Sequence, residues 1–197
     1  MTASSSNPAR TRALDAMVLV YALLEGHPAS AACEQMIRER KGWFTTSMTL
    51  LEVKAVLTKV YGVEATEVTQ KLTQIVSGPL AVLPVDAALV LTAMATADRL
   101  SLDLAVAVLL ETALAQQAMN LATDDGRLAD SCRKLGLAPE EPFSDELRGE
   151  VAAWESAHLP AKGLPRVLGR IERWLGERDE VLAQDFRSQT GGNSHLP

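Results

Sequence analysis

The segment MNLATDDGRL, residues 119–128, decides the fold, because it holds the signals of a strand, a turn and a helix in ten residues. Met119–Ala122 is a short apolar run typical of a buried strand. Asp124-Asp125-Gly126 ends that strand and introduces a helix that extends to Leu135-Gly136. Similar junctions recur upstream, so strands and helices alternate along most of the chain. This alternation predicts an α/β fold whose central sheet is mainly parallel and covered by helices on both faces.

The sequence predicts four or five short strands. Strands are expected at 13–14, 43–46, 80–85 and 119–122. The residues before Asp15 include Arg10 and Arg12, which makes the first strand too polar for deep burial. Apolar spacing predicts helices at 16–24, from His27-Pro28 onward, from Ser47 to near Gly62, and at 66–76, 87–97 and 104–117.

Composition and punctuation divide the chain into four parts. We expect a flexible tail at 1–11, an α/β domain at 12–137, a linker and helical extension at 138–189, and a flexible tail at 190–197. Within the extension, 138–146 reads as a linker, and a short helix ends near Pro160. Apolar residues at steps of three and four predict one amphipathic helix over 164–187, which packs on the core or mediates dimerisation.

The overall composition excludes several classes of protein. Hydrophobic residues make up 47% of the 197 residues, too many for a disordered chain. No apolar run reaches the roughly 18 residues of a membrane span, and no secretory signal opens the sequence. Cys33 and Cys132 lie far apart without a CxxC pattern, which suits a reducing cytoplasm and argues against zinc. The net charge of -6 argues against indiscriminate binding to nucleic acid.

Four acidic residues stand where strands end or helices begin: Asp15, Glu52, Asp103 and Asp125. In a parallel sheet the carboxyl ends of the strands share one edge, so these carboxylates are expected to converge. Clustered carboxylates suit Mg²⁺ or Mn²⁺, which would orient a water molecule and neutralise charge on a scissile phosphate. The competing interpretation is local: each Asp caps a helix, and Glu52 is an ordinary solvated helix residue.

Four segments, in this order, resemble the motifs of PIN-domain nucleases over about residues 12–137. They are Leu14–Tyr21, Thr46–Val53, Leu100–Ala105 and Leu121–Leu128. The resemblance implies that the metal-binding and catalytic set is Asp15, Glu52, Asp103 and Asp125. It further implies that Asp124, Thr123 and Ser47 support this set from the second layer of contacts, Thr123 through its hydroxyl group.

The resemblance also implies an activity and its partners. It predicts a Mg²⁺- or Mn²⁺-dependent endoribonuclease of the VapC-like toxin branch, a homodimer neutralised by a small antitoxin protein. Basic residues near the motifs, Lys54 and Arg127, are candidates for holding RNA phosphates. A stripe on the predicted C-terminal helix either is solvated or reaches RNA; it consists of Arg166, Arg170 and Arg173.

One position departs from the family pattern. Met17 stands where the family usually has Asn, and a thioether is a poorer hydrogen-bonding partner for an acidic site than an amide. Two alternatives therefore stay open: a non-catalytic PIN-like module that binds protein or RNA, and another α/β phosphatase or nuclease with an acidic metal cluster.

Overall fold

The computed structural model describes residues 11–159 and 166–189. The chain divides between Gly149 and Glu150 into two compact units. Both tails expected from the sequence fall outside the described residues, apart from Thr11. Among the described residues, none of the helices combines the length and the apolar character that a membrane crossing requires.

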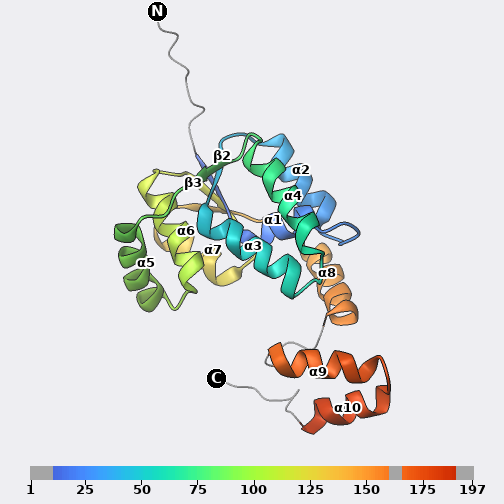
Figure 1. Ribbon diagram of the computed structural model, residues 1–197. Coiled ribbons are helices and arrows are strands. Elements are labelled where there is room, and N and C mark those ends of the chain that lie inside the picture. Colours follow the sequence, from blue (N-terminus) through green and yellow to red (C-terminus); the bar gives the residue numbers. More distant parts are fainter. Residues whose placement is uncertain (1–10, 160–165, 190–197) are drawn as a thin grey trace, which may run out of the picture. The chain divides into compact units, whose positions relative to one another are not determined.

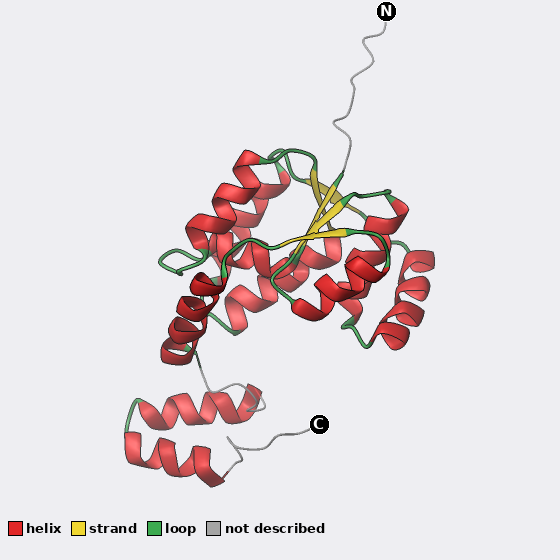
Figure 2. Ribbon diagram, turned by 180° about the vertical axis from the view of Figure 1, so that it is seen from behind, coloured by secondary structure: helices red, strands yellow, loops and turns green. Residues whose placement is uncertain are grey.

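The first unit is built around one sheet of five parallel strands, which confirms the predicted fold class. The strand order is β3-β2-β1-β4-β5, and helices surround the strands (Figure 2). The strands are β1 (Arg12–Leu14), β2 (Trp43–Thr46), β3 (Ala81–Leu83), β4 (Asn120–Ala122) and β5 (Ala138–Glu140).

The helices match the predicted order closely (Figure 1). Pro84 directly follows β3, as the sequence indicated, because proline removes a ladder hydrogen bond. The helices of this unit are α1 (Ala16–Leu23), α2 (Ser30–Glu39), α3 (Ser47–Lys59), α4 (Ala65–Val76), α5 (Ala87–Leu100), α6 (Leu104–Ala115) and α7 (Gly126–Lys134). Helix α8 (Asp145–His158) begins in this unit.

Strand β5 corrects the interpretation of 138–146 as a linker. Leu121 of β4 pairs in parallel with Pro139, and Ala122 pairs with Glu140. Three residues that include a proline give almost no strand signal, but an edge strand tolerates proline because one side of it needs no partner.

The prediction that the first strand is too polar for deep burial was wrong, because β1 is the middle strand of the sheet. Ala13 and Leu14 have no exposed surface. The polar residue that argued against burial, Arg12, forms an ion pair with Glu140 and lies over the ring of Trp43. The ion pair with Glu140 and the contact with the Trp43 ring therefore offset the loss of hydration at the Arg12 guanidinium group.

The order of the strands creates the setting for a site. The chain runs from β1 to β2 and β3 in one direction, and α5 and α6 then carry it to β4 and β5 on the other side of β1. The order in which strands are added to the sheet therefore reverses between β1 and β4, and we call this place the switch point. Ligands of open α/β sheets bind at such a point, outside the carboxyl ends of the strands. Here the Asp15 amide donates to the Ala122 carbonyl oxygen over 3.1 Å.

The second unit contains a helical hairpin in place of the single helix expected over 164–187. It consists of α9 (Arg166–Gly176) and α10 (Glu180–Gln189), which pack against each other. The break follows Gly176, and the Asp179 carboxylate then accepts hydrogen bonds from the Val181 and Leu182 amides at the start of α10. A buried Glu172 pairs with Arg187 across the hairpin. Whether it packs on the core or mediates dimerisation stays a prediction.

Candidate active site

Asp15 lies directly after the central strand and is 5% exposed. One carboxylate oxygen, Oδ1, accepts the Ala16 amide over 2.7 Å at the start of α1. The other, Oδ2, accepts the hydroxyl of the fully buried Thr123 over 2.8 Å. The two sides of the switch point are thus joined through the side chains of Asp15 and Thr123.

The loop after β4 is held by the same hydroxyl group. Thr123 Oγ1 accepts the Asp125 amide over 3.1 Å, and Asp125 Oδ1 accepts the amides of Arg127 and Leu128 at the start of α7. Asp124 stands between them and is half-buried. Its carboxylate accepts a hydrogen bond from the Tyr21 hydroxyl of α1.

The two remaining acids come from α3 and from the start of α6. Thr46, not Ser47, caps α3 by accepting the Thr49 amide over 3.1 Å, and Glu52 lies in the second turn of that helix. Asp103 occupies the N-cap position of α6, but its side chain makes no capping hydrogen bond. Asp15 and Asp125 therefore do cap α1 and α7, as the local interpretation expects, whereas Asp103 makes no such bond.

The charges of these five acids act on one another. Burial, followed by the nearby charges of Asp124 and Glu52, raises the pKa of Asp15 to about 7, against the hydrogen bonds from Thr123 and Ala16. Burial and the Asp103 charge raise the pKa of Glu52. Burial also raises the pKa of Asp124, to which the neighbouring charge of Asp125 adds. The fold thus brings the predicted acids together, as expected at a site that receives a cation.

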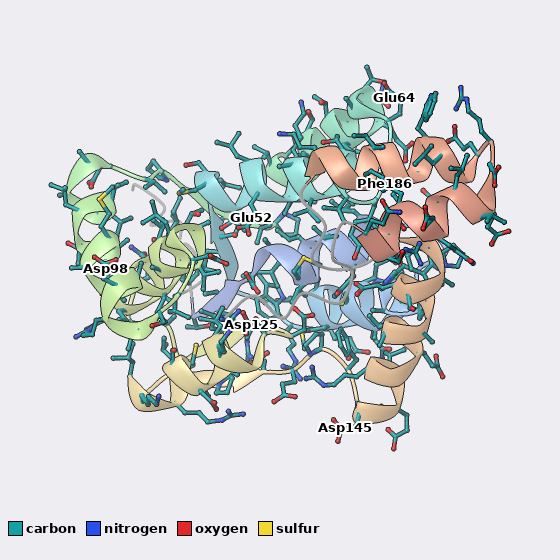
Figure 3. All side chains as sticks on the ribbon, turned by 90° about the horizontal axis from the view of Figure 1, so that it is seen from below. Glu52, Glu64, Asp98, Asp125, Asp145 and Phe186 are labelled. Carbon is teal, nitrogen blue, oxygen red and sulfur yellow. The ribbon has the colours of Figure 1, made fainter. Side chains whose placement is uncertain are left out.

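Figure 3 labels two members of this cluster and three acids outside it, among them Asp98 and Asp145. Glu52 on α3 and Asp125 at the start of α7 lie toward the middle of the first unit, whereas Asp98 and Asp145 lie at its periphery.

The donor set fits a hard divalent cation in kind. All five side chains offer carboxylate oxygens, and Asp103 uses neither of its oxygens for a helix cap. Within residues 11–159 and 166–189, however, no three acidic, histidine or cysteine side chains are arranged to hold a metal ion as they stand. Carboxylates repel one another until a cation lies between them, so coordination requires side-chain rotation.

The other predicted site residues are spread more widely. Ser47 is exposed and, within the described part of the chain, forms no side-chain hydrogen bond with Glu52. Lys54 donates to Thr69 Oγ1 over 3.0 Å and so links α3 to α4. Arg127 is exposed and lines a pocket beside Asp124 and Asp125. Arg173 is exposed on α9, and the side chains of Arg166 and Arg170 lie outside the described residues.

Two residues beside the acids were missed by the sequence reasoning. Tyr21 contacts Asp124 from α1, and its ring stacks on His27 at a centroid distance of 4.7 Å. Arg148, from the start of α8, donates to the Asp124 carbonyl oxygen over 3.2 Å. Tyr21 could have been predicted, because it is a polar residue inside the first motif. Nothing in the local sequence connects Arg148 to a loop 24 residues earlier.

Comparisons with known proteins agree with this fold. The family model described as PIN domain matches residues 13–134. A toxin of Mycobacterium tuberculosis, VapC20, described as cleaving the sarcin–ricin loop, superposes with a TM-score of 0.56 at 14% identity, over 61% of this chain and 95% of that one. A chain of a toxin–antitoxin complex from Klebsiella pneumoniae superposes with a TM-score of 0.52 at 16% identity, over 68% and 99%. No curated protein sequence matches the chain.

Proposed function

Because the chain belongs to the PIN-domain family, we propose that it is a metal-dependent endoribonuclease, the toxin of a toxin–antitoxin pair. One observation carries the proposal: acids from four separate segments lie at the switch point, where burial and neighbouring carboxylate charges raise the pKa values of Asp15, Glu52 and Asp124. Such a cluster costs folding free energy unless a cation is bound, so it is the expected signature of a site kept for function.

The proposed roles follow from the contacts. Asp15, Glu52, Asp103 and Asp125 would hold Mg²⁺ or Mn²⁺, which supplies an acidified water molecule and positive charge at the scissile phosphate. The Thr123 hydroxyl holds the Asp15 carboxylate and the loop after β4 in one arrangement. Asp15 has a pKa of about 7, so it gives up its proton when positive charge enters the site, and metal affinity should rise with pH.

The first experiment is cleavage of a structured RNA hairpin by the purified protein. We expect cleavage with Mg²⁺ or Mn²⁺ and none with a chelator, because the acids alone cannot neutralise charge on the phosphate. The products are followed on a denaturing gel. Equal cleavage with and without the chelator would reject the metal site.

The non-catalytic alternative is tested with the same preparation. It rests on Met17, which offers no amide to the acids, but Tyr21 on the same helix supplies a hydrogen bond to Asp124. Calorimetric titration with Mn²⁺ is expected to show binding. A folded protein that binds no Mn²⁺ at millimolar concentration would favour the binding module.

We further propose that a small antitoxin protein binds the groove between α1, α2 and α4 in the cytoplasm. The Klebsiella pneumoniae neighbour is described as a toxin–antitoxin complex. In this chain the groove has a volume of about 890 Å³, and its wall is largely apolar, with Leu19, Leu23, Ile37, Trp43, Ile75 and Leu80 among its lining residues. Such a wall suits apolar side chains of a partner. The predicted homodimer stays part of the proposal.

Two neighbouring residues of α4 allow a matched test of this groove. Ile75 lines it, whereas Val76 is 53% exposed and does not. Ile75→Glu should weaken binding of a small protein encoded beside this gene by at least roughly tenfold, because the charge would be buried against apolar groups. Val76→Glu should change binding little, and equal effects of the two substitutions would place the interface elsewhere.

A further inference from the structure

A pocket of about 520 Å³ opens beside the acids, between the loop after β4 and the segment that leads into α8. Asp124 and Asp125 form one side of it. The remainder of its charged lining comes from residues outside the proposed metal-binding set, namely Arg127, Asp130, Arg133, Glu141 and Arg148. Three guanidinium groups therefore stand next to the place where a phosphodiester would be cleaved.

One carboxylate lies between two of these arginines. Glu141 Oε2 accepts from Arg148 Nη2 over 2.5 Å, and Glu141 Oε1 lies 3.4 Å from Arg133 Nη2. Arg148 is also fixed by the Asp124 carbonyl oxygen and by the ring of Phe143, 5.3 Å from the guanidinium carbon. Arg133 in turn donates to Asp130 Oδ1 over 2.8 Å. Each oxygen of Glu141 thus faces a different guanidinium group, and both of these groups are held by a further partner.

This arrangement matches a different anion equally well. A phosphodiester carries one negative charge over two non-bridging oxygens, as a carboxylate does, and arginine binds both through paired N–H donors. On the basis of the proposed function, we propose that Arg133 and Arg148 form the seat of an RNA backbone phosphate next to the scissile one, and that Glu141 fills this seat in the free protein.

The ion pairs of Glu141 are exposed enough to exchange. The side chains of Arg133, Glu141 and Arg148 are 53%, 45% and 33% exposed, and exposed pairs contribute little to stability. Glu141 directly follows the edge strand β5, where no further strand holds it. An incoming phosphate therefore replaces one weak partner of the arginines with another anion of the same charge.

The proposal is tested by RNA binding, separately from cleavage. A fluorescent single-stranded RNA is titrated in the Asp103→Asn background, so that it stays intact, at several salt concentrations. Arg148→Gln should weaken binding at least roughly tenfold, as for loss of a charge-assisted hydrogen bond. It should also reduce the slope of log affinity against log salt by about 0.7, the value for one phosphate contact on a single strand.

Glu141→Gln should act in the opposite direction and tighten binding roughly threefold, because it removes the competing anion. This substitution keeps the test decisive where Arg148→Gln disturbs the loop, since a damaged fold does not bind RNA more tightly. Matched controls come from an exposed Arg–Glu pair on α2, Arg38 and Glu34. Arg38→Gln and Glu34→Gln make the same charge changes and should alter affinity less than twofold.

The outcomes separate this inference from the proposed function. Metal-dependent cleavage by the wild type, together with binding that Arg148→Gln and Glu141→Gln leave unchanged, would overturn the phosphate seat and keep the nuclease. If RNA binding responds to both substitutions as described but the wild-type protein does not cleave RNA, the phosphate seat is kept and the nuclease is overturned. Equal effects at α2 and at the pocket would also overturn the seat, because they would reflect net charge alone.

Discussion

Asp103→Asn is expected to reduce metal-dependent RNA cleavage by at least roughly a hundredfold while leaving the fold intact. Substitution of groups that only support a metal ligand typically costs 10- to 100-fold, so loss of a ligand's charge should cost at least the upper end. Asp103 is well suited to this test, because its side chain makes no capping bond to α6 whose loss would destabilise the helix. Its charge also contributes to the raised pKa of Glu52, so the variant should relieve repulsion.

The matched control is Asp98→Asn. Asp98 is exposed on α5, only five positions earlier in the chain, and it lies at the periphery, away from the acid cluster (Figure 3). It should retain cleavage within about twofold, since surface substitutions away from a site are usually near neutral. Rates at saturating Mg²⁺ and thermal unfolding curves are compared for both variants. Similar loss of activity in both, or undiminished cleavage by Asp103→Asn, would remove Asp103 from the site.

The fold could be predicted wherever local signals and tertiary context agree. Three sequence signals mark ends of elements that the structure reproduces: the apolar run before Thr123 for β4, the glycine after Leu135 for α7 and the proline after Leu83 for β3. Residues 138–140 form a strand only because β4 offers a free edge, which no local pattern records. The break between α9 and α10 was different, because Gly176 and the capping Asp179 were visible in the sequence and were outweighed by the long apolar period.

The candidate site was predictable to the extent that strand ends could be located. Asp15, Asp124 and Asp125 converge because they follow the adjacent strands β1 and β4 at the same edge of the sheet, and Glu52 lies on the helix that follows β2. Asp103 opens α6 after another helix, so strand order alone does not place it. The groups that hold them are set by packing. The Arg148 contact with the loop after β4 depends on where α8 begins, and the Glu141 contacts depend on the unpredicted strand β5.

Asp15→Asn is expected to stabilise the metal-free protein at pH 8 while it abolishes cleavage. The pKa of Asp15 is about 7 in the folded protein against an ordinary value of 3.8, so folding favours the protonated form. The free energy of unfolding that this group contributes is fully present below pH 3.8 and is lost as the pH rises through 7. Each unit of pKa difference corresponds to about 1.4 kcal/mol, so the loss of unfolding free energy is about 4 kcal/mol. This figure is an upper limit for one buried group.

Asparagine stays neutral over this whole range and therefore avoids that loss. Its Oδ1 can keep the bond from the Ala16 amide, and its Nδ2 can donate to Thr123 Oγ1 in place of the present bond. We expect the variant to exceed the wild type in unfolding free energy by about 2–4 kcal/mol at pH 8 and to be nearly equal to it near pH 4. Urea unfolding at the two pH values, in the presence of a chelator, measures the difference.

Asp86→Asn provides the control, because Asp86 is also a helix N-cap but is exposed, and its carboxylate accepts the Leu89 amide over 2.8 Å. Asn and Asp cap helices about equally well, so this variant should follow the wild type at both pH values.

Glu52 and Asp124 also have raised pKa values, so the Asp15 variant should keep part of the decline in stability toward pH 8. Added Mg²⁺ should stabilise the wild type at pH 8 and the Asp15 variant much less, since an ion that binds only the folded state shifts the equilibrium toward it. A wild type equally stable at pH 5 and pH 8 without metal would mean that Asp15 ionises at no cost, and the buried acid would then give no reason to infer a cation site at the switch point.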